Sequence, residues 1–108
     1  MSRPEQERLL DILAACEAIA SYLERESLDN DVRFDAIRVR LIEIGEAVKD
    51  LSPETRTLEP GIPWQEIARM RDHLAHRYFD TAHSLLRATA ERDVPDLVAA
   101  VRRMLSRR

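Results

Sequence analysis

The chain contains one cysteine, two glycines and few aromatic residues among its 108 residues. A single cysteine forms no intramolecular disulfide, and no second cysteine or histidine stands at metal-ligand spacing from Cys16. We therefore expect Cys16 to be a small buried apolar residue and the chain to have no metal site. Because no apolar run approaches the length of a membrane span and no apolar segment follows the charged first residues, the sequence predicts a cytoplasmic protein without membrane contact.

The chain has no excess of positive charge. Although 34% of the residues are charged, the formal net charge is −3. Such a chain repels nucleic acid as a whole, so any nucleic-acid contact must come from a local cluster of arginines. Two clusters are present: Arg69, Arg71 and Arg77 in the middle, and Arg102, Arg103, Arg107 and Arg108 at the end. Favourable interaction with a helix dipole accounts for the terminal cluster. The middle cluster is therefore the candidate contact.

The spacing of apolar residues predicts helices throughout and no strand. Apolar residues recur at steps of three and four in the first segment and occupy heptad a and d positions in the second. The expected helices span residues 5–23, 32–51, 63–78 and 82–91, with a last one after 93. A long connection over 52–61 contains a possible helical turn at its start. The fold class is therefore all-α, an antiparallel up-and-down bundle of four to five helices in one domain over 1–108.

Two local signals refine this expectation. Gly45 lies beside the apolar seam of the second helix, where a glycine costs about 1 kcal/mol relative to alanine. We expect close approach by a neighbouring helix to offset this cost. Asp93, Val94 and Pro95 are typical of a helix start, which predicts that the last helix begins there with Asp93 as its cap. Asp80 is expected to lie in the break before the preceding helix.

The third expected helix places Arg71 at the centre of an apolar face. That face comprises Trp64, Ile67, Ala68, Leu74, Ala75 and Tyr78. A guanidinium in such a position needs an acidic partner, a subunit boundary or an anionic ligand. An ion pair with Glu43 or Glu46 is the structural alternative to a functional role for Arg71.

Three titratable residues, Asp72, His73 and His76, lie on the opposite side of the same helix. Asp72 and His76 are four residues apart and therefore able to form a hydrogen bond that fixes the imidazole tautomer. Arg71 and His76, however, lie about 140° apart around a regular helix. We expect either a distortion of the helix near Ala75 or contributions from two subunits to one site.

The isolated residue His83 lacks comparable titratable neighbours in the sequence. We interpret it as a solvated or capping side chain.

The segment from Arg71 to Tyr78 resembles a known motif. Arg71, four residues and then His76, with Asp72 after the arginine, match the Arg-x4–6-His motif of HEPN domains, and Tyr78 extends it to the Arg-x4-His-x-Tyr form of HepT-like toxins. Further segments are similar to that family's second helix, to the start of its motif helix and to its last helix: residues 34–38, 44–47, 62–64 and 93–97. Departures are Arg87, where relatives often carry an aromatic residue, and the extra imidazole of His73.

The resemblance implies a homodimeric, metal-independent endoribonuclease that needs no cofactor and serves as the toxin of a bacterial toxin–antitoxin pair. His76 would act as general base on the ribose 2′-hydroxyl or as acid to the leaving oxygen, while Arg71 would hold the phosphate and Asp72 would orient His76. Accessory RNA contacts would come from His73, Arg69 and Arg77.

The resemblance also implies a partner protein, a minimal nucleotidyltransferase that acts as antitoxin. It would adenylylate Tyr78, and the added AMP would block the RNA site through its bulk and negative charge. Ordinary packing of the Tyr78 ring is the structural alternative. A different class of function also stays open: a catalytically idle helical dimer that is binding partner and substrate of the nucleotidyltransferase. The acidic net charge favours this second hypothesis.

Overall fold

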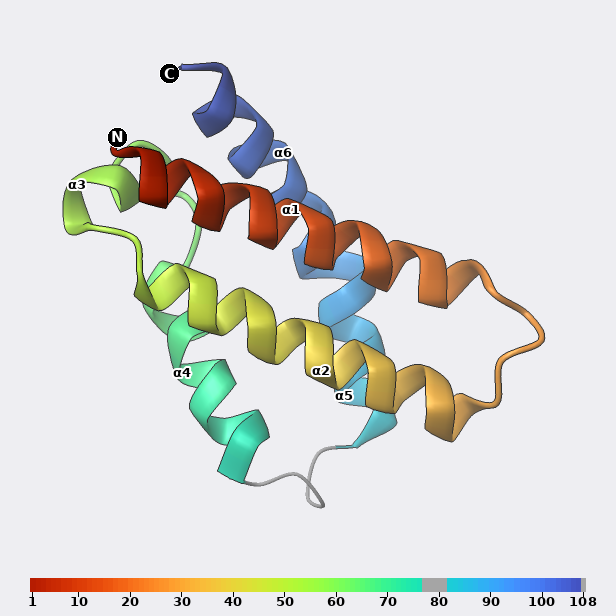
Figure 1. Cartoon of the computed structure of the whole chain (residues 1–108). Coiled ribbons are helices and arrows are strands. Elements are labelled where there is room, and N and C mark those ends of the chain that lie inside the picture. Colours follow the sequence, from red (N-terminus) through yellow and green to blue (C-terminus); the bar gives the residue numbers. More distant parts are fainter. Residues whose placement is uncertain (77–81, 108) are drawn as a thin grey trace.

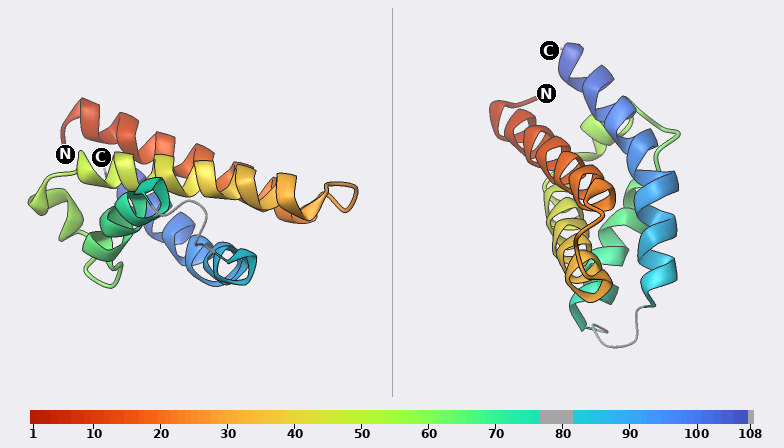
Figure 2. Two further views of the ribbon diagram at one scale, coloured as in Figure 1. Left: turned by 90° about the horizontal axis from the view of Figure 1, so that it is seen from below. Right: turned by 90° about the vertical axis from the view of Figure 1, so that its right-hand side faces the viewer.

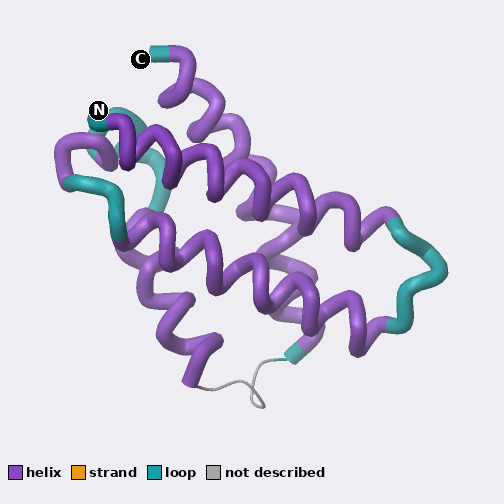
Figure 3. Tube along the Cα trace, viewed as in Figure 1, coloured by secondary structure: helices purple, strands orange, loops and turns teal. Residues whose placement is uncertain are grey.

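The structure, a computed structural model, describes residues 1–76 and 82–107, and every regular element in them is a helix (Figure 3). The elements are α1 (Arg3–Glu24), α2 (Asn30–Lys49), α3 (Pro53–Arg56), α4 (Trp64–His76), α5 (His83–Ala88), the π-helical turn η2 (Thr89–Asp93) and α6 (Val94–Ser106). The expected all-α fold is confirmed. Within the described residues, no helix has the length and apolar character needed to cross a membrane.

The helices pack around the antiparallel hairpin of α1 and α2 (Figure 1). α4 packs on α2, while α6 packs on α1 and α5 contacts α2. Figure 2 shows that α5, η2 and α6 follow one another as a single rod behind the hairpin, which brings the two marked ends of the chain to the same end of the molecule. Among the described elements α4 packs chiefly on α2, and its opposite side has no covering helix in this part of the chain.

The apolar stripes of the first two helices form the core, as their spacing predicts. The deeply buried residues of these stripes are Leu9, Ile12, Cys16, Ile19, Phe34, Ile37, Leu41, Ile44, Val48 and Leu51. Burial raises the pKa of the Cys16 thiol to about 12, so this cysteine stays protonated and inert. The interpretation of Cys16 as a small buried residue is confirmed.

Glu5 joins the start of α1 to the connection after α2. Ser2 and Glu5 form a capping box at the beginning of α1, and Glu5 Oε1 also accepts a hydrogen bond of 2.6 Å from the backbone N–H of Ser52. Ser52 in turn caps α3, because its hydroxyl accepts from the Thr55 N–H at 3.2 Å. The helical turn expected at this position is confirmed.

Hydrogen bonds from Ser52 lower the pKa of Glu5 from 4.5 to about 2. A carboxyl with a depressed pKa in the folded state contributes stability above its unfolded pKa and loses it as the pH falls toward the folded value. We therefore expect the free energy of unfolding to fall between pH 4.5 and about 2, and to fall less steeply in a Glu5→Gln variant. Urea unfolding of both proteins across this range measures the difference, and parallel curves would contradict the assignment.

The last helix begins at Val94, as expected, but the expected capping by Asp93 is wrong. Asp93 has helical backbone angles and its side chain makes no capping hydrogen bond. The chain instead continues from α5 into α6 through η2, where the Val94 N–H donates to the Thr89 carbonyl five residues back. Because Pro95 has no N–H and crowds the preceding turn, a widened π-helical turn directly before it accommodates the proline without ending the helix.

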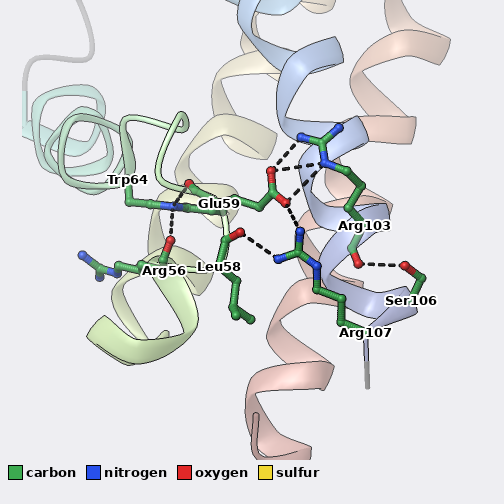
Figure 4. Close-up of polar contacts among 7 residues, drawn as sticks. All are labelled: Arg56, Leu58, Glu59, Trp64, Arg103, Ser106 and Arg107. Atoms are coloured by element: carbon green, nitrogen blue, oxygen red, sulfur yellow. Dashed lines mark hydrogen bonds and ion pairs between the residues drawn. The ribbon is translucent and has the colours of Figure 1, made fainter.

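An ionic cluster around the buried residue Glu59 attaches the connection between α3 and α4 to α6 (Figure 4). Arg103 Nη2 lies 2.7 Å from Glu59 Oε1, and Arg107 Nη2 lies 3.2 Å from Glu59 Oε2. The hydrogen bonds from Arg103 lower the pKa of the Glu59 carboxyl. These two arginines, which the sequence analysis attributed to the helix dipole, thus have a specific acidic partner. Beside them, the Trp64 indole N–H donates to the backbone carbonyls of Arg56 and Glu59, each at 3.0 Å.

Candidate active site

α4 carries the candidate residues and begins at a fixed point. Trp64, its first residue, is 6% exposed and anchored by its two indole hydrogen bonds. The Ile67 N–H donates to the carbonyl of Pro63 at 3.1 Å, so Pro63 lies directly before the first turn, as expected. From Trp64 to His76 the helix is continuous. Up to His76, where the described part of this helix ends, the structure shows no break near Ala75.

α2 and α4 approach each other closely at Gly45. A Cβ atom on Gly45 would overlap the Cβ atom of Arg71, and it would lie 3.2 Å from both Arg71 Cγ and the Ile67 carbonyl oxygen. The close approach expected at this glycine is confirmed, and the neighbour is the candidate arginine. Gly45 thus allows the base of the Arg71 side chain to lie against the backbone of α2.

The Arg71 guanidinium contacts two carboxylates. Its Nε donates to Glu46 Oε1, and its Nη1 lies 3.2 Å from Asp72 Oδ1. The ion pair with Glu46 that was one of the alternatives is confirmed, whereas Glu43 pairs with Arg40 at 3.1 Å. Hydrogen bonding to Glu46, reinforced by Asp72, raises the pKa of Arg71 further above its usual value. The side chain remains 29% exposed, so solvent and ligands can reach it.

Asp72 has a second cationic partner that the sequence analysis missed. Lys49 Nζ lies 2.6 Å from Asp72 Oδ1, and this hydrogen bond, followed by the one from Arg71, lowers the pKa of Asp72. Among the described residues, the Asp72 carboxylate bonds to Lys49 and Arg71 and not to His76. The only signal in the sequence is that Lys49 follows Gly45 by four residues, which places the two residues on the same face of α2.

The remaining candidates lie on the uncovered side of α4. His76 is the last residue of the helix and is exposed, as are His73 and Arg69. The candidates Arg77 and Tyr78 lie outside the described residues. In those parts of the chain that the structure describes, no group of three or more His, Cys, Asp or Glu is placed to hold a metal ion.

The angular gap between Arg71 and His76 remains in the structure. Asp72 lies about 100° from Arg71 around the helix and about 40° from His76. Its carboxylate contacts Arg71 and, from α2, Lys49, so the Asp72 side chain lies toward α2. Arg71 and His76 of one chain therefore project from different sides of α4.

The interpretation of His83 as a solvated or capping side chain is wrong. Its ring stacks on Phe34 with the centroids 4.8 Å apart and an interplanar angle of 28°, and its Nε2 lies 3.7 Å from Asp31 Oδ1. His83 thus packs the beginning of α5 against α2.

Comparison with known proteins decides the family. The family model described as ribonuclease HepT-like matches residues 12–104. The chain belongs to the HepT-like family. It is 38% identical over 102 residues to a protein named "Probable ribonuclease HepT" from Thermococcus cleftensis, covering 90% of this chain and 92% of that protein. No solved structure gives a significant match.

Two further relatives of this HepT-like chain are named provisionally as RNases. The protein from Caldanaerobacter subterraneus subsp. tengcongensis is 35% identical over 100 residues, covering 89% of each chain. One protein from Methanocaldococcus jannaschii is 34% identical over 93 residues, covering 82% of this chain and 77% of the relative. The names support ribonuclease activity for the family.

The structure also places Arg87, which the sequence singled out. Its guanidinium carbon lies 5.1 Å from the centroid of the Phe34 ring, which is a cation–π contact.

Proposed function

We propose that this HepT-like chain is a metal-independent endoribonuclease that cuts RNA through the ribose 2′-hydroxyl and acts as the toxin of a bacterial toxin–antitoxin pair. The observation that carries the proposal is the placement of Arg71. Gly45 and Glu46 of α2 position its side chain at the contact between α2 and α4, and His76 is exposed at the end of the same helix. A permanently charged donor and an exposed imidazole are groups suited to transfer of a phosphoryl group.

His76 supplies the proton transfer in this mechanism. As general base it removes the proton of the 2′-hydroxyl, or as general acid it protonates the leaving 5′-oxygen. The 2′-oxygen attacks the adjacent phosphorus, the bond to the 5′-oxygen breaks, and the products are a 2′,3′-cyclic phosphate and a 5′-hydroxyl. Arg71 stabilises the negative charge that develops on the phosphate oxygens. DNA lacks the attacking hydroxyl and is not cut by this route.

The complete site is proposed to form between two copies of the chain. His73 and His76 are exposed on α4, and we propose that they face the α4 of a second copy. Arg71 of one copy and His76 of the other then act on one phosphate, with Asp72 holding the charged imidazole and with His73, Arg69 and Arg77 as accessory RNA contacts. A minimal nucleotidyltransferase antitoxin is proposed to silence this site by adenylylating Tyr78.

A catalytically idle binding partner of the nucleotidyltransferase is the second candidate. The observation that favours it is the neutralisation of Arg71, because Glu46 and Asp72 both contact the guanidinium. An RNA phosphate has to compete with these carboxylates for the positive charge.

Incubation of the purified protein with total RNA in excess EDTA tests the proposal. We expect fragments with 2′,3′-cyclic phosphate ends, and we expect single-stranded DNA to remain intact. Mass spectrometry of the protein establishes whether Tyr78 is unmodified before the assay. Intact RNA after incubation with unmodified protein would contradict the proposed activity and support the binding-partner function.

A further inference from the structure

We propose that Lys49 and Arg71 together form a phosphate site for RNA, and that the carboxylate of Asp72 occupies this site when RNA is absent. The inference rests on the proposed RNA substrate. Its basis is a convergence of two cations on one atom: Asp72 Oδ1 lies 2.6 Å from Lys49 Nζ and 3.2 Å from Arg71 Nη1. An anionic oxygen that takes the place of Oδ1 is within hydrogen-bond distance of both cations.

The hydrogen-bonding capacity of the two cations exceeds what Asp72 uses. A guanidinium has five N–H donors, of which Arg71 commits one to Glu46 and one to Asp72 among the described residues. An ammonium has three donors, and Lys49 gives one to Asp72. A phosphate group offers several acceptor oxygens, so it satisfies donors that a single carboxylate oxygen leaves to solvent.

Access to the site is open. The side chains of Lys49 and Asp72 are 38% and 49% exposed, and that of Arg71 is 29% exposed. Asp72 can therefore rotate outward and release both cations to an arriving phosphate without moving a buried group. The exposure also means that the Lys49–Asp72 ion pair itself contributes little to stability.

The location suits a phosphate beside the reacting one. Lys49 is the last residue of α2, and its ammonium crosses to α4 at Asp72, one helical turn before His76 and on nearly the same face. A bound phosphate there places the neighbouring ribose near the imidazole. Lys49 and Arg71 place two positive charges next to each other in a chain whose net charge is −3, and Glu46 and Asp72 balance these charges when RNA is absent.

The test measures binding of a fluorescently labelled single-stranded RNA of mixed sequence in a His76→Ala background, where the RNA stays intact. Affinity is measured at several salt concentrations with and without Lys49→Gln. We expect Lys49→Gln to make the slope of log affinity against log salt less negative by about 0.7, the value for one lost phosphate contact to a single strand. Lys49→Arg should retain the slope. Arg3→Gln removes the same charge from a side chain that is 91% exposed on α1, and should change nothing.

The Asp72→Asn variant distinguishes two roles of Lys49: binding a phosphate, or only linking α2 to α4 through the ion pair with Asp72. Both Lys49→Gln and Asp72→Asn break the ion pair, so a purely structural role predicts the same direction of change in RNA affinity for the two variants. Competition for the cations predicts opposite directions: weaker binding for Lys49→Gln and tighter binding at low salt for Asp72→Asn.

The outcomes also separate this inference from the proposed function. If the protein with His76 cuts RNA but Lys49→Gln binds RNA with an unchanged salt slope, the phosphate site is refuted while the ribonuclease stands. If the protein does not cut RNA but the two variants shift binding in opposite directions, the phosphate site is supported and the ribonuclease activity is refuted. Absence of any RNA binding refutes both.

Discussion

Replacement of His76 by alanine is expected to slow RNA cleavage by about 10²- to 10⁴-fold, the range for loss of a general acid or base. The imidazole is exposed at the end of α4, where it supports no buried contact in the described structure. We therefore expect the free energy of unfolding to change by no more than about 0.5 kcal/mol. A large loss of activity with little loss of stability distinguishes a chemical role from a structural one.

The matched comparison for this variant is His73→Ala. His73 is also an exposed histidine on α4, three residues earlier and about 60° from His76 around the helix. As an accessory RNA contact it should affect KM more than kcat, and by less than about tenfold. Initial rates of cleavage of a labelled RNA in excess EDTA, with urea unfolding of each variant, measure both effects. Equal losses of kcat in the two variants would contradict the assignment of His76 as the acid or base.

Arg71→Ala tests the other half of the proposed chemistry. Loss of a charged donor to the developing negative charge typically lowers kcat by about 10²- to 10³-fold. Arg71→Lys retains the charge but not the planar fork of donors, so we expect it to recover RNA binding better than turnover. Recovery of full turnover by lysine would show that a point charge is sufficient at this position.

The core was predictable because burial follows helical spacing. The heptad positions from Phe34 to Leu51 are buried, as the sequence indicates. Gly45 lies at a close contact between helices, and this contact offsets the cost of a glycine inside a helix, as inferred. Periodicity indicates which face of a helix is covered. It does not indicate how α4 crosses α2, and the residue that contacts Gly45 depends on this crossing.

The continuous rod from α5 to α6 shows where local signals fail. Asp93, Val94 and Pro95 have the composition of a helix start, yet Val94 and Leu97 continue the buried face begun at Ala90. Burial of this face against the core favours an unbroken rod, and the π-helical turn removes the conflict with Pro95. The helix-start signal thus predicts the start of α6 correctly, but tertiary packing joins α6 to the preceding helix without a cap at Asp93.

The site was only partly predictable for a similar reason. The alternatives for Arg71 included Glu46, because both the arginine and the acidic residues stood out on their helices. Lys49 did not stand out, since a lysine in a last helical turn is explained by the helix dipole alone. Its contact with Asp72 becomes visible only when α2 and α4 are placed together.

Replacement of Gly45 by alanine is expected to disturb the active site more than the fold. Helix propensity alone favours alanine by about 1 kcal/mol. The added Cβ, however, would overlap Arg71 Cβ and would crowd the Ile67 carbonyl, neither of which is the flexible end of a side chain. Overpacking of this kind costs about 1–3 kcal/mol. The clash therefore outweighs the propensity, and we expect a net loss of about 1 kcal/mol in the free energy of unfolding.

The effect on activity should be larger, because α4 must shift to relieve the overlap and Arg71 shifts with it. A misplacement of about 1 Å can lower the rate by about 10²-fold. Gly61→Ala is the matched control, since a Cβ on Gly61 meets no atom within 4 Å. Urea unfolding and RNA cleavage rates measure both variants. A Gly45→Ala protein that is stabilised and fully active would contradict the close contact between α2 and α4.

A double-mutant cycle isolates this contact from the other effects of Gly45→Ala. Arg71→Gly removes the Cβ and Cγ atoms that the new methyl group would meet, leaving the Ile67 carbonyl oxygen at 3.2 Å as the remaining neighbour. In that background the helix propensity of alanine should dominate, so Gly45→Ala is expected to stabilise the protein by up to about 1 kcal/mol. The sign of one substitution then reverses with the presence of one side chain. Only direct contact between positions 45 and 71 produces that reversal, because a general weakening of α2 would lower stability in both backgrounds.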